Sequence, residues 1–209
     1  GAELRVQRRL SAGTTASRYW GTNGRTVTPV ANTNQKIAIS ESSMALAAAS
    51  NIVAVTWEEA SEVYARCIYG SGTNSNSMQL SSSTGVQRNP SIYLNAAGSR
   101  AFVVWEDGRF ANTLTGWGIF GIELELSGIT LSVSTGWYAD SANSDANGVA
   151  IVLKDFNYSV HDPIIFPYNN NGNMLMFWLK ETVTSTDTDL YYLYPQSYMG
   201  GVNYLPAWN

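Results

Sequence analysis

Two pairs of adjacent acidic residues are the first candidates for chemistry in this sequence. Glu58-Glu59 and Glu106-Asp107 each stand directly after a tryptophan. A glycosidase needs two carboxylates about 5–10 Å apart in one cleft, whereas adjacent residues of a strand point to opposite faces. The shared position of the two pairs therefore predicts a turn or a hydrogen-bonding role. A cleft that brings Asp162 or Asp155 near Glu106 would instead favour a glycoside-processing enzyme.

The turn Asp107-Gly108-Arg109 is expected to contain a local ion pair. Few sites of histidine or cysteine chemistry are possible, because His161 is the only histidine and Cys67 the only cysteine. A Ser-His-Asp triad of the G-x-S-x-G type and a zinc site with several His or Cys ligands are both excluded within this sequence. Cys67 lies in an alternating run and is expected to be a packed strand thiol. We assign no catalytic residue and expect the chain not to be an enzyme.

One segment has the spacing of a calcium loop. In Asn143-Ser144-Asp145-Ala146-Asn147-Gly148, the ligands of a D-x-[DN]-x-[DN]-G loop would be Asn143, Asp145 and Asn147. Position 12 of the loop is Lys154 instead of glutamate, so a polar surface turn is the alternative. Calcium is the only cofactor that the sequence leaves open.

Aromatic side chains in polar loops are candidates for glycan binding, because the C–H faces of sugars stack on rings. Trp117, Trp137, Tyr138 and Trp20 lie in loops rich in Gly, Ser and Thr. The same rings would equally suit packing between sheets or an interface between subunits.

The overall composition limits the class of protein. Of 209 residues, 44% are hydrophobic and only 13% are charged, about half the usual ~25%. Such a chain is not intrinsically disordered, and it has no apolar run of ~18 residues that could span a membrane. The net charge of −4 argues against nucleic acid as the main partner. Abundant Ser, Thr, Asn, Trp and Tyr indicate a secreted or cell-surface protein.

The elements that position these residues are predicted to be strands that repeat. Period-2 alternation recurs throughout and indicates an all-β chain. Three apolar runs end on Trp57, Trp105 and Trp178, which are expected to lie in the core. Pro90 and Pro163 each stand 15 residues before the tryptophan that follows, and each comes directly after Asn or Asp.

These landmarks divide one all-β domain, residues 1–209, into repeats. We expect an outer half-blade at 1–33 and blades at 34–86, 87–159 and 160–209. The second blade has an insertion near 137–158, with a strand of its own around 148–153. Repeated four-stranded antiparallel meanders of ~40–50 residues are typical of β-propeller blades. The expected fold is a β-propeller-like array that forms an incomplete ring within one chain; a β-sandwich or jelly roll is the alternative.

One motif also points to a known family. Val103-Val104-Trp105-Glu106-Asp107-Gly108-Arg109, followed by Gly118 to Leu124 and Gly128, resembles the repeats of secreted bacterial β-propeller proteins, with their V-V-W-x-D-x-R and I-Y-G-type strands. A second copy at 55–66 lacks the arginine, and a third at 177–192 lacks the acidic pair. The resemblance implies a propeller fold and a surface location. Such proteins act as binding or scaffolding modules or as glycosidase-like enzymes, so it implies no single activity.

The repeat count predicts association. Three and a half units cannot close a ring of about 4–8 blades, and an open ring exposes apolar faces and strand edges. We therefore expect a homo-oligomer or filament of this chain, or a longer chain that supplies the remaining blades. The predicted function is an extracellular structural or adhesive module. The alternatives are a carbohydrate-binding lectin that uses the loop tryptophans and a fragment of a glycoside-processing enzyme.

Overall fold

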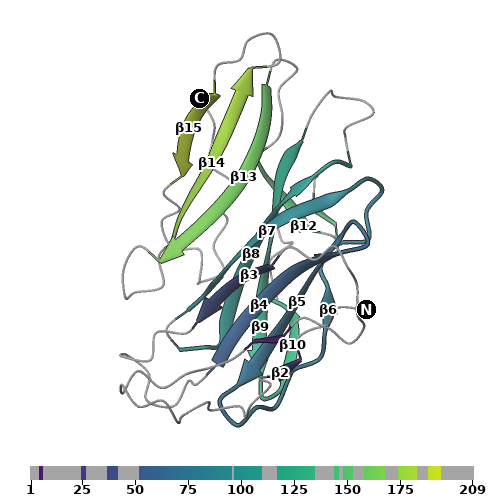
Figure 1. Ribbon diagram of the computed structural model, residues 1–209, viewed down its shortest axis with the longest axis vertical. Helices are drawn as coiled ribbons and strands as arrows, with labels where there is room; N and C mark the ends of the chain where they lie inside the picture. The colour runs from purple at the N-terminus through teal and green to yellow at the C-terminus, as the bar shows by residue number, and fades with distance from the viewer. Residues whose placement is uncertain are drawn as a thin grey trace.

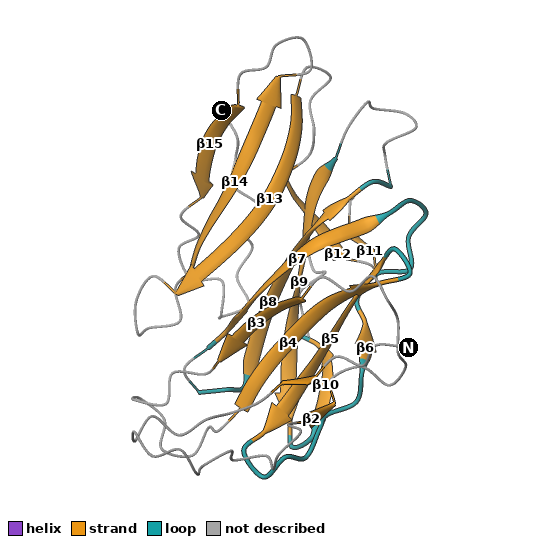
Figure 2. Cartoon of the chain, viewed as in Figure 1, coloured by secondary structure: helices purple, strands orange, loops and turns teal. Residues whose placement is uncertain are grey.

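The computed structural model describes residues 52–95, 97–109, 117–134, 148, 159–165 and 176–180 in full. It describes the backbone alone of residues 5–6, 25–26, 37–41, 144–145, 149–152, 158, 166–167, 174–175, 181–182 and 188–193. Every regular element in these ranges is a β-strand, and every strand pairing is antiparallel (Figures 1 and 2). The expectation of an all-β chain is thus confirmed for the described part. No helix in that part is long and apolar enough to cross a membrane.

Three sheets follow one another along the chain, each built from consecutive strands. The first sheet is a four-stranded meander of β3 (Ile37–Glu41), β4 (Ile52–Glu59), β5 (Glu62–Tyr69) and β6 (Met78–Gln79). The third sheet is a three-stranded meander of β13 (Tyr158–Pro167), β14 (Met174–Thr182) and β15 (Thr188–Leu193). A separate pair joins β1 (Arg5–Val6) and β2 (Arg25–Thr26). The sheets do not close into a ring among the described residues.

The second sheet lies between the other two and has the largest number of strands. Its core is β7 (Gln87–Leu94), β8 (Arg100–Asp107) and β9 (Gly118–Ser127). The outer edge of β9 is shared: β10 (Thr130–Val133) pairs with its second half, and β12 (Gly148–Val152) pairs with its first half. The short β11 (Ser144–Asp145) pairs with β12. β11 and β12 lie within residues 137–158, where the sequence predicts an insertion.

Strand alternation gives the second sheet two apolar faces, and each is covered by a neighbouring sheet. Ile92, Val103, Trp105, Phe120 and Ile122 form one core with residues of β4 and β5 in the first sheet. The opposite face forms a second core with the third sheet, made of Tyr93, Phe102, Val104, Ile119, Val160, Ile165, Met176 and Trp178. The first strands of successive sheets are neighbours, since β7 contacts β3 on one side and β13 on the other.

The three repeat tryptophans are buried, as expected, and they point the same way along the stack. Trp178 belongs to the core shared with the second sheet, and Trp105 belongs to the core shared with the first. Trp57 lies on the face of the first sheet that points away from the second, with Val53, Val55 and Ile68. In the second and third sheets, the tryptophan thus faces the preceding sheet. In the first sheet, Trp57 points in the same direction along the stack.

Candidate functional site

The acidic residue two positions after a tryptophan binds that tryptophan. Trp57 Nε1 donates to Glu59 Oε2 at 3.0 Å, and Trp105 Nε1 donates to Asp107 Oδ2 at 2.9 Å. A buried indole N–H needs such a partner. The hydrogen-bonding role predicted for the acidic pairs is therefore confirmed for these two residues.

Asp107 also forms the local ion pair that the sequence predicts. Its Oδ1 accepts from the backbone N–H and from Nε of Arg109, both at 2.9 Å, and its Oδ2 lies 2.8 Å from Arg109 Nη2. The guanidinium lies over the ring of Phe120, with 3.9 Å between Cζ and the ring centroid. Both charged groups are buried, so this turn at the end of β8 is a rigid part of the framework.

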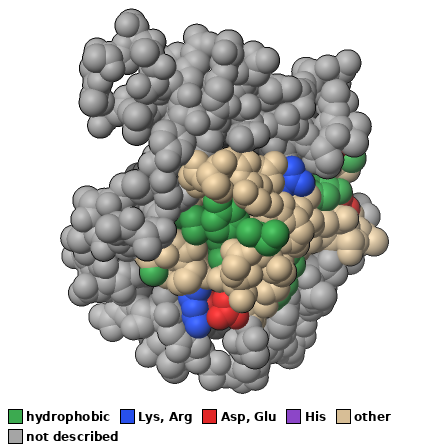
Figure 3. All heavy atoms as spheres, turned by 90° about the horizontal axis from the view of Figure 1, so that it is seen from below, with side chains coloured by type: hydrophobic (Ala, Val, Ile, Leu, Met, Phe, Trp, Pro, Cys, Tyr) green, Lys and Arg blue, Asp and Glu red, His purple; other side chains and the backbone are tan. Residues whose placement is uncertain are grey.

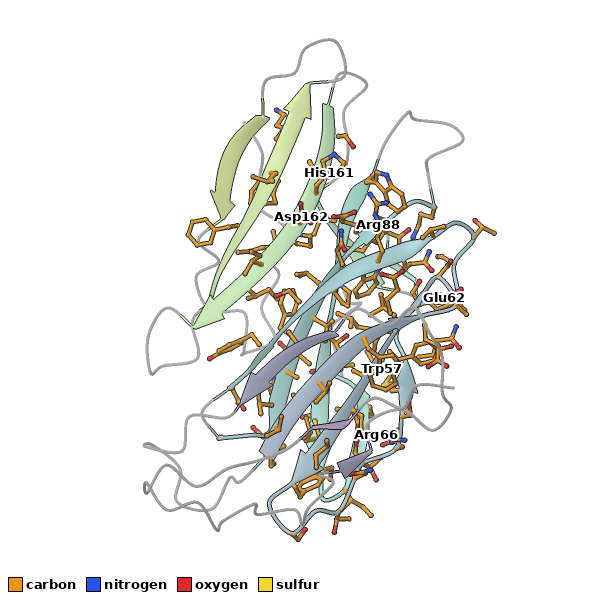
Figure 4. The ribbon with its side chains drawn as sticks, in the orientation of Figure 1. Trp57, Glu62, Arg66, Arg88, His161 and Asp162 are labelled. Carbon is orange, nitrogen blue, oxygen red and sulfur yellow. The ribbon has the colours of Figure 1, made fainter. Side chains whose placement is uncertain are left out.

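Glu106 is the centre of a hydrogen-bonded network between two sheets. Its buried carboxylate accepts from Arg88 Nε at 2.6 Å, from Asn89 Nδ2 at 2.7 Å and from the backbone N–H of Asp162 at 2.7 Å. Arg88 and Asn89 belong to β7, whereas Asp162 belongs to β13 of the third sheet. We call these four residues the Glu106 network; Arg88 and Asp162 are labelled in Figure 4.

Two equivalent β-bulges bring the network together. The pairing register of β7 with β8 shifts between Arg88 and Ser91, and that of β13 with β14 shifts between His161 and Ile164. Asn89 and Asp162 adopt the left-handed conformation there, both with φ of 49°. Asn and Asp tolerate this region better than other L-residues, and a bulge re-aims the groups next to it. The repeated Asx-Pro dipeptide therefore lies at a bulge. The sequence predicts that these positions correspond, but it does not predict the bulge.

Of the two aspartates whose approach to Glu106 would favour an enzyme, Asp162 does lie close to it. Asp162 lies next to Glu106, and both carboxylates accept from Asn89 Nδ2, at 3.3 and 2.7 Å. Asp155 lies outside the described residues. Glu106 is wholly buried and its oxygens accept from three donors, so it does not face a substrate as a catalytic carboxylate must. Glu106 and Asp162 are therefore arranged to hold the second and third sheets together.

Of the four aromatic residues predicted to bind glycans, the structure describes only Trp117. Its half-buried ring stacks against Arg88, with 3.7 Å between the guanidinium carbon and the ring centroid. Its edge lies over Gly108, where an added Cβ would be 3.1 Å from Cζ3. Trp20, Trp137 and Tyr138 lie outside the described residues. Trp117 is thus a neighbour of the Glu106 network, through a contact that the sequence did not signal.

Of the three predicted calcium ligands, the structure describes only Asp145, and only its backbone. Asp145 and Gly148 are antiparallel partners in the β11–β12 pairing, while Asn143 and Asn147 lie outside the described residues. Among the described residues, no group of three His, Cys, Asp or Glu side chains could hold a metal ion. Calcium binding by this loop stays a prediction.

Burial changes the ionisation of two further side chains. Desolvation raises the pKa of Cys67 to about 12, so the thiol stays protonated and packed in β5, as the sequence predicts. Desolvation also raises the pKa of Glu123, against the opposing effects of Ser134 and Arg100. The Arg100 Nη1–Glu123 Oε1 ion pair, at 2.8 Å, is the counterpart of the Arg88–Glu106 pair on the same sheet.

The two ends of the stack differ in exposure. At the first sheet, Trp57, Val55 and Ile68 are completely buried. At the third sheet, Ile164 is 46% exposed and pairs with half-buried Phe177. These two residues and half-buried Leu179 lie opposite the face that packs on the second sheet; we call them the outer face of the third sheet.

Comparisons with known proteins give no relative, since the chain matches no protein-family model, no curated protein and no solved structure.

Proposed function

We propose that this chain is an extracellular structural or adhesive module, a propeller-like array of β-meanders that pairs with a second copy of itself. The pairing uses the outer face of the third sheet. The observation that carries the proposal is the 46% exposure of Ile164 on the outer face of the third sheet, whereas the apolar faces of the first and second sheets are buried among the described residues.

The propeller-like arrangement is supported by the repeated orientation of the sheets. Trp57, Trp105 and Trp178 point in one direction along the stack. The first strands β3, β7 and β13 are neighbours in turn, as expected where blades radiate from an axis. A two-sheet sandwich gives no reason for three sheets to repeat in this way.

The composition of the outer face favours another apolar surface as its partner. Tyr93, Phe102 and Val104 are the second-sheet residues that receive the third sheet. Counted from the repeat tryptophans, the equivalent positions of the third sheet are Phe166, Leu175 and Phe177, and all are apolar. Ile164 is the exposed residue of this apolar face, and exposed apolar patches on proteins mark sites of association.

The identity of that partner follows from two further features. Leu179 stands where the second sheet has Glu106, so the third sheet lacks the carboxylate that binds the bulge of a following sheet. The opposite end of the stack, around Trp57, is already buried. Among the described residues, Ile164 is the only exposed large apolar side chain that lies within a strand, which fits a two-fold contact in which the same face of two copies meets. The partner is therefore a second copy, and the assembly is a dimer.

The extracellular assignment rests on composition. Charged residues make up only 13% of the chain, and on the face that Figure 3 shows, few of the described side chains are those of Lys, Arg, Asp or Glu. A surface module of this kind interacts through shape and hydrogen bonds more than through net charge.

Light scattering across a range of concentrations tests the proposal. A solution mass of twice 22.8 kDa is expected. A monomer at all concentrations would overturn self-association. Rings or filaments in negative-stain images of the same sample would overturn the two-fold contact.

A further inference from the structure

The guanidinium of Arg88, beside Trp117 and Asp162, has the features of a small binding site. We propose that Arg88, Trp117 and Asp162 bind the hydroxyl groups of a neutral glycan. This inference does not depend on self-association, since it concerns the junction of the second and third sheets and uses none of the residues of the outer face.

Arg88 is held rigidly while part of it remains accessible. Its Nε binds Glu106 Oε2 at 2.6 Å, and its flat face lies 3.7 Å from the Trp117 centroid. The side chain is 34% exposed, and within the described part of the chain its terminal nitrogens Nη1 and Nη2 have no hydrogen-bond partner. A guanidinium has donors in a fixed fork, so the remaining N–H groups are presented outward in one orientation.

Asp162 supplies an acceptor that is fixed by the same buried carboxylate. Its side chain is exposed, and its backbone N–H donates to Glu106 Oε1 at 2.7 Å. Its Oδ1 lies 3.3 Å from Asn89 Nδ2. Because the donor and the acceptor are both positioned through Glu106, little conformational entropy is lost when a ligand binds them.

The charges of the site favour a neutral ligand over an anion. The charge of Arg88 is compensated by Glu106, and Asp162 adds a carboxylate that forms no ion pair within the described part of the chain, whose net charge over the full sequence is −4. A vicinal diol satisfies both groups, because one hydroxyl oxygen accepts from Arg88 and a neighbouring hydroxyl donates to Asp162. The guanidinium covers one face of the Trp117 indole, so the part of this half-buried ring that stays exposed is the apolar surface that the sugar ring meets.

Saturation-transfer NMR with the methyl glycosides of glucose, galactose and mannose tests this site. We expect transfer from the wild-type protein to at least one of the three. Trp117→Ala and Arg88→Met should weaken that binding about tenfold, the effect of losing one good hydrogen bond or stacking contact. Arg100→Met is the matched control, because Arg100 is 30% exposed and also pairs with a buried glutamate.

Milder variants keep the test valid if Arg88→Met fails to fold. Arg88→Lys keeps the charge but removes the fork, and Asp162→Asn changes only an exposed side chain. Both should weaken glycoside binding and leave the solution mass unchanged, which separates this site from self-association. The proposal would be overturned by absence of transfer to all three glycosides, by stronger binding of glucuronate, or by equal losses in Arg88→Lys and Arg100→Met.

Discussion

Glu106 of β8 accepts the backbone N–H of Asp162 in β13 at 2.7 Å, so a buried side chain of one sheet binds the bulge of the next. The same carboxylate binds Arg88 and Asn89 at the bulge of its own sheet. One residue therefore fixes two equivalent bulges relative to each other. This relationship determines how the second and third sheets meet at the end where Trp117 lies.

Removal of Glu106 should destabilise the whole chain. Glu106→Ala leaves Arg88 without its ion pair and the Asp162 N–H without an acceptor, which should cost about 2–4 kcal/mol. Glu125→Ala, at a 39% exposed site on the same sheet, should cost less than about 1 kcal/mol. Urea denaturation measures both, and equal losses would show that the Glu106 network contributes no special stability.

The two bulge residues should respond differently to glycine. Glycine relieves the left-handed backbone at both sites, but only Asn89 gives up a side-chain hydrogen bond to a buried carboxylate. Asp162→Gly should change the free energy of unfolding by no more than about 1 kcal/mol, whereas Asn89→Gly should lower it by about 1–2 kcal/mol. A larger loss for Asp162→Gly in thermal or urea unfolding would contradict this account of the bulges.

How far the sequence predicts this fold is clear from particular residues. The alternation around Trp57, Trp105 and Trp178 predicts buried strands, because side chains of a strand alternate between faces. The equal spacing of Pro90 and Pro163 marks corresponding positions without revealing their backbone conformation. That conformation depends on pairing with β8 and β14, which is not a local property of the sequence.

The candidate site was less predictable for the same reason. The sequence shows Glu106 as an acidic residue at a repeated position, but its three donors come from β7 and β13 and meet only when the sheets stack. The sequence shows Trp117 as an aromatic residue in a polar loop, and its contact with Arg88 joins residues that are distant in sequence. Nothing in the local pattern of either residue indicates the other.

Gly148 should be intolerant of any side chain. Its φ is +96°, and an added Cβ would lie 2.5 Å from Cη2 of Trp105. Gly148→Ala should therefore cost about 2–4 kcal/mol and alter the near-UV circular dichroism of the buried indole. Gly128→Ala is the matched control, since its φ is +58° but its Cβ would meet no atom within 4 Å. A loss of about 1 kcal/mol is expected there, and equal losses would contradict the Trp105 contact.

Glu123 should make the stability depend on pH. Burial raises its pKa in the folded chain above the ordinary value of 4.5, so folding favours its protonated form. The stability that this preference contributes is present below pH 4.5 and is lost as the pH rises through the folded-state pKa. As the pH rises through this pKa, the free energy of unfolding of Glu123→Gln should therefore increase relative to that of the wild type.

Unfolding curves at several pH values measure this difference. Glu125→Gln removes the same charge from an exposed neighbour that shares Arg100, so this variant should change the pH dependence less than Glu123→Gln does. A difference between wild type and Glu123→Gln that stays constant from pH 4.5 upward would contradict the prediction.

Sedimentation of two matched isoleucine variants tests the central claim most directly. Ile164 on the outer face is 46% exposed, and Ile129 in the turn between β9 and β10 is 59% exposed, so neither change to aspartate should alter stability by more than about 0.5 kcal/mol. The account predicts that Ile164→Asp sediments as a monomer, while Ile129→Asp keeps twice the chain mass. An Ile164→Asp protein that still forms the wild-type dimer would contradict it.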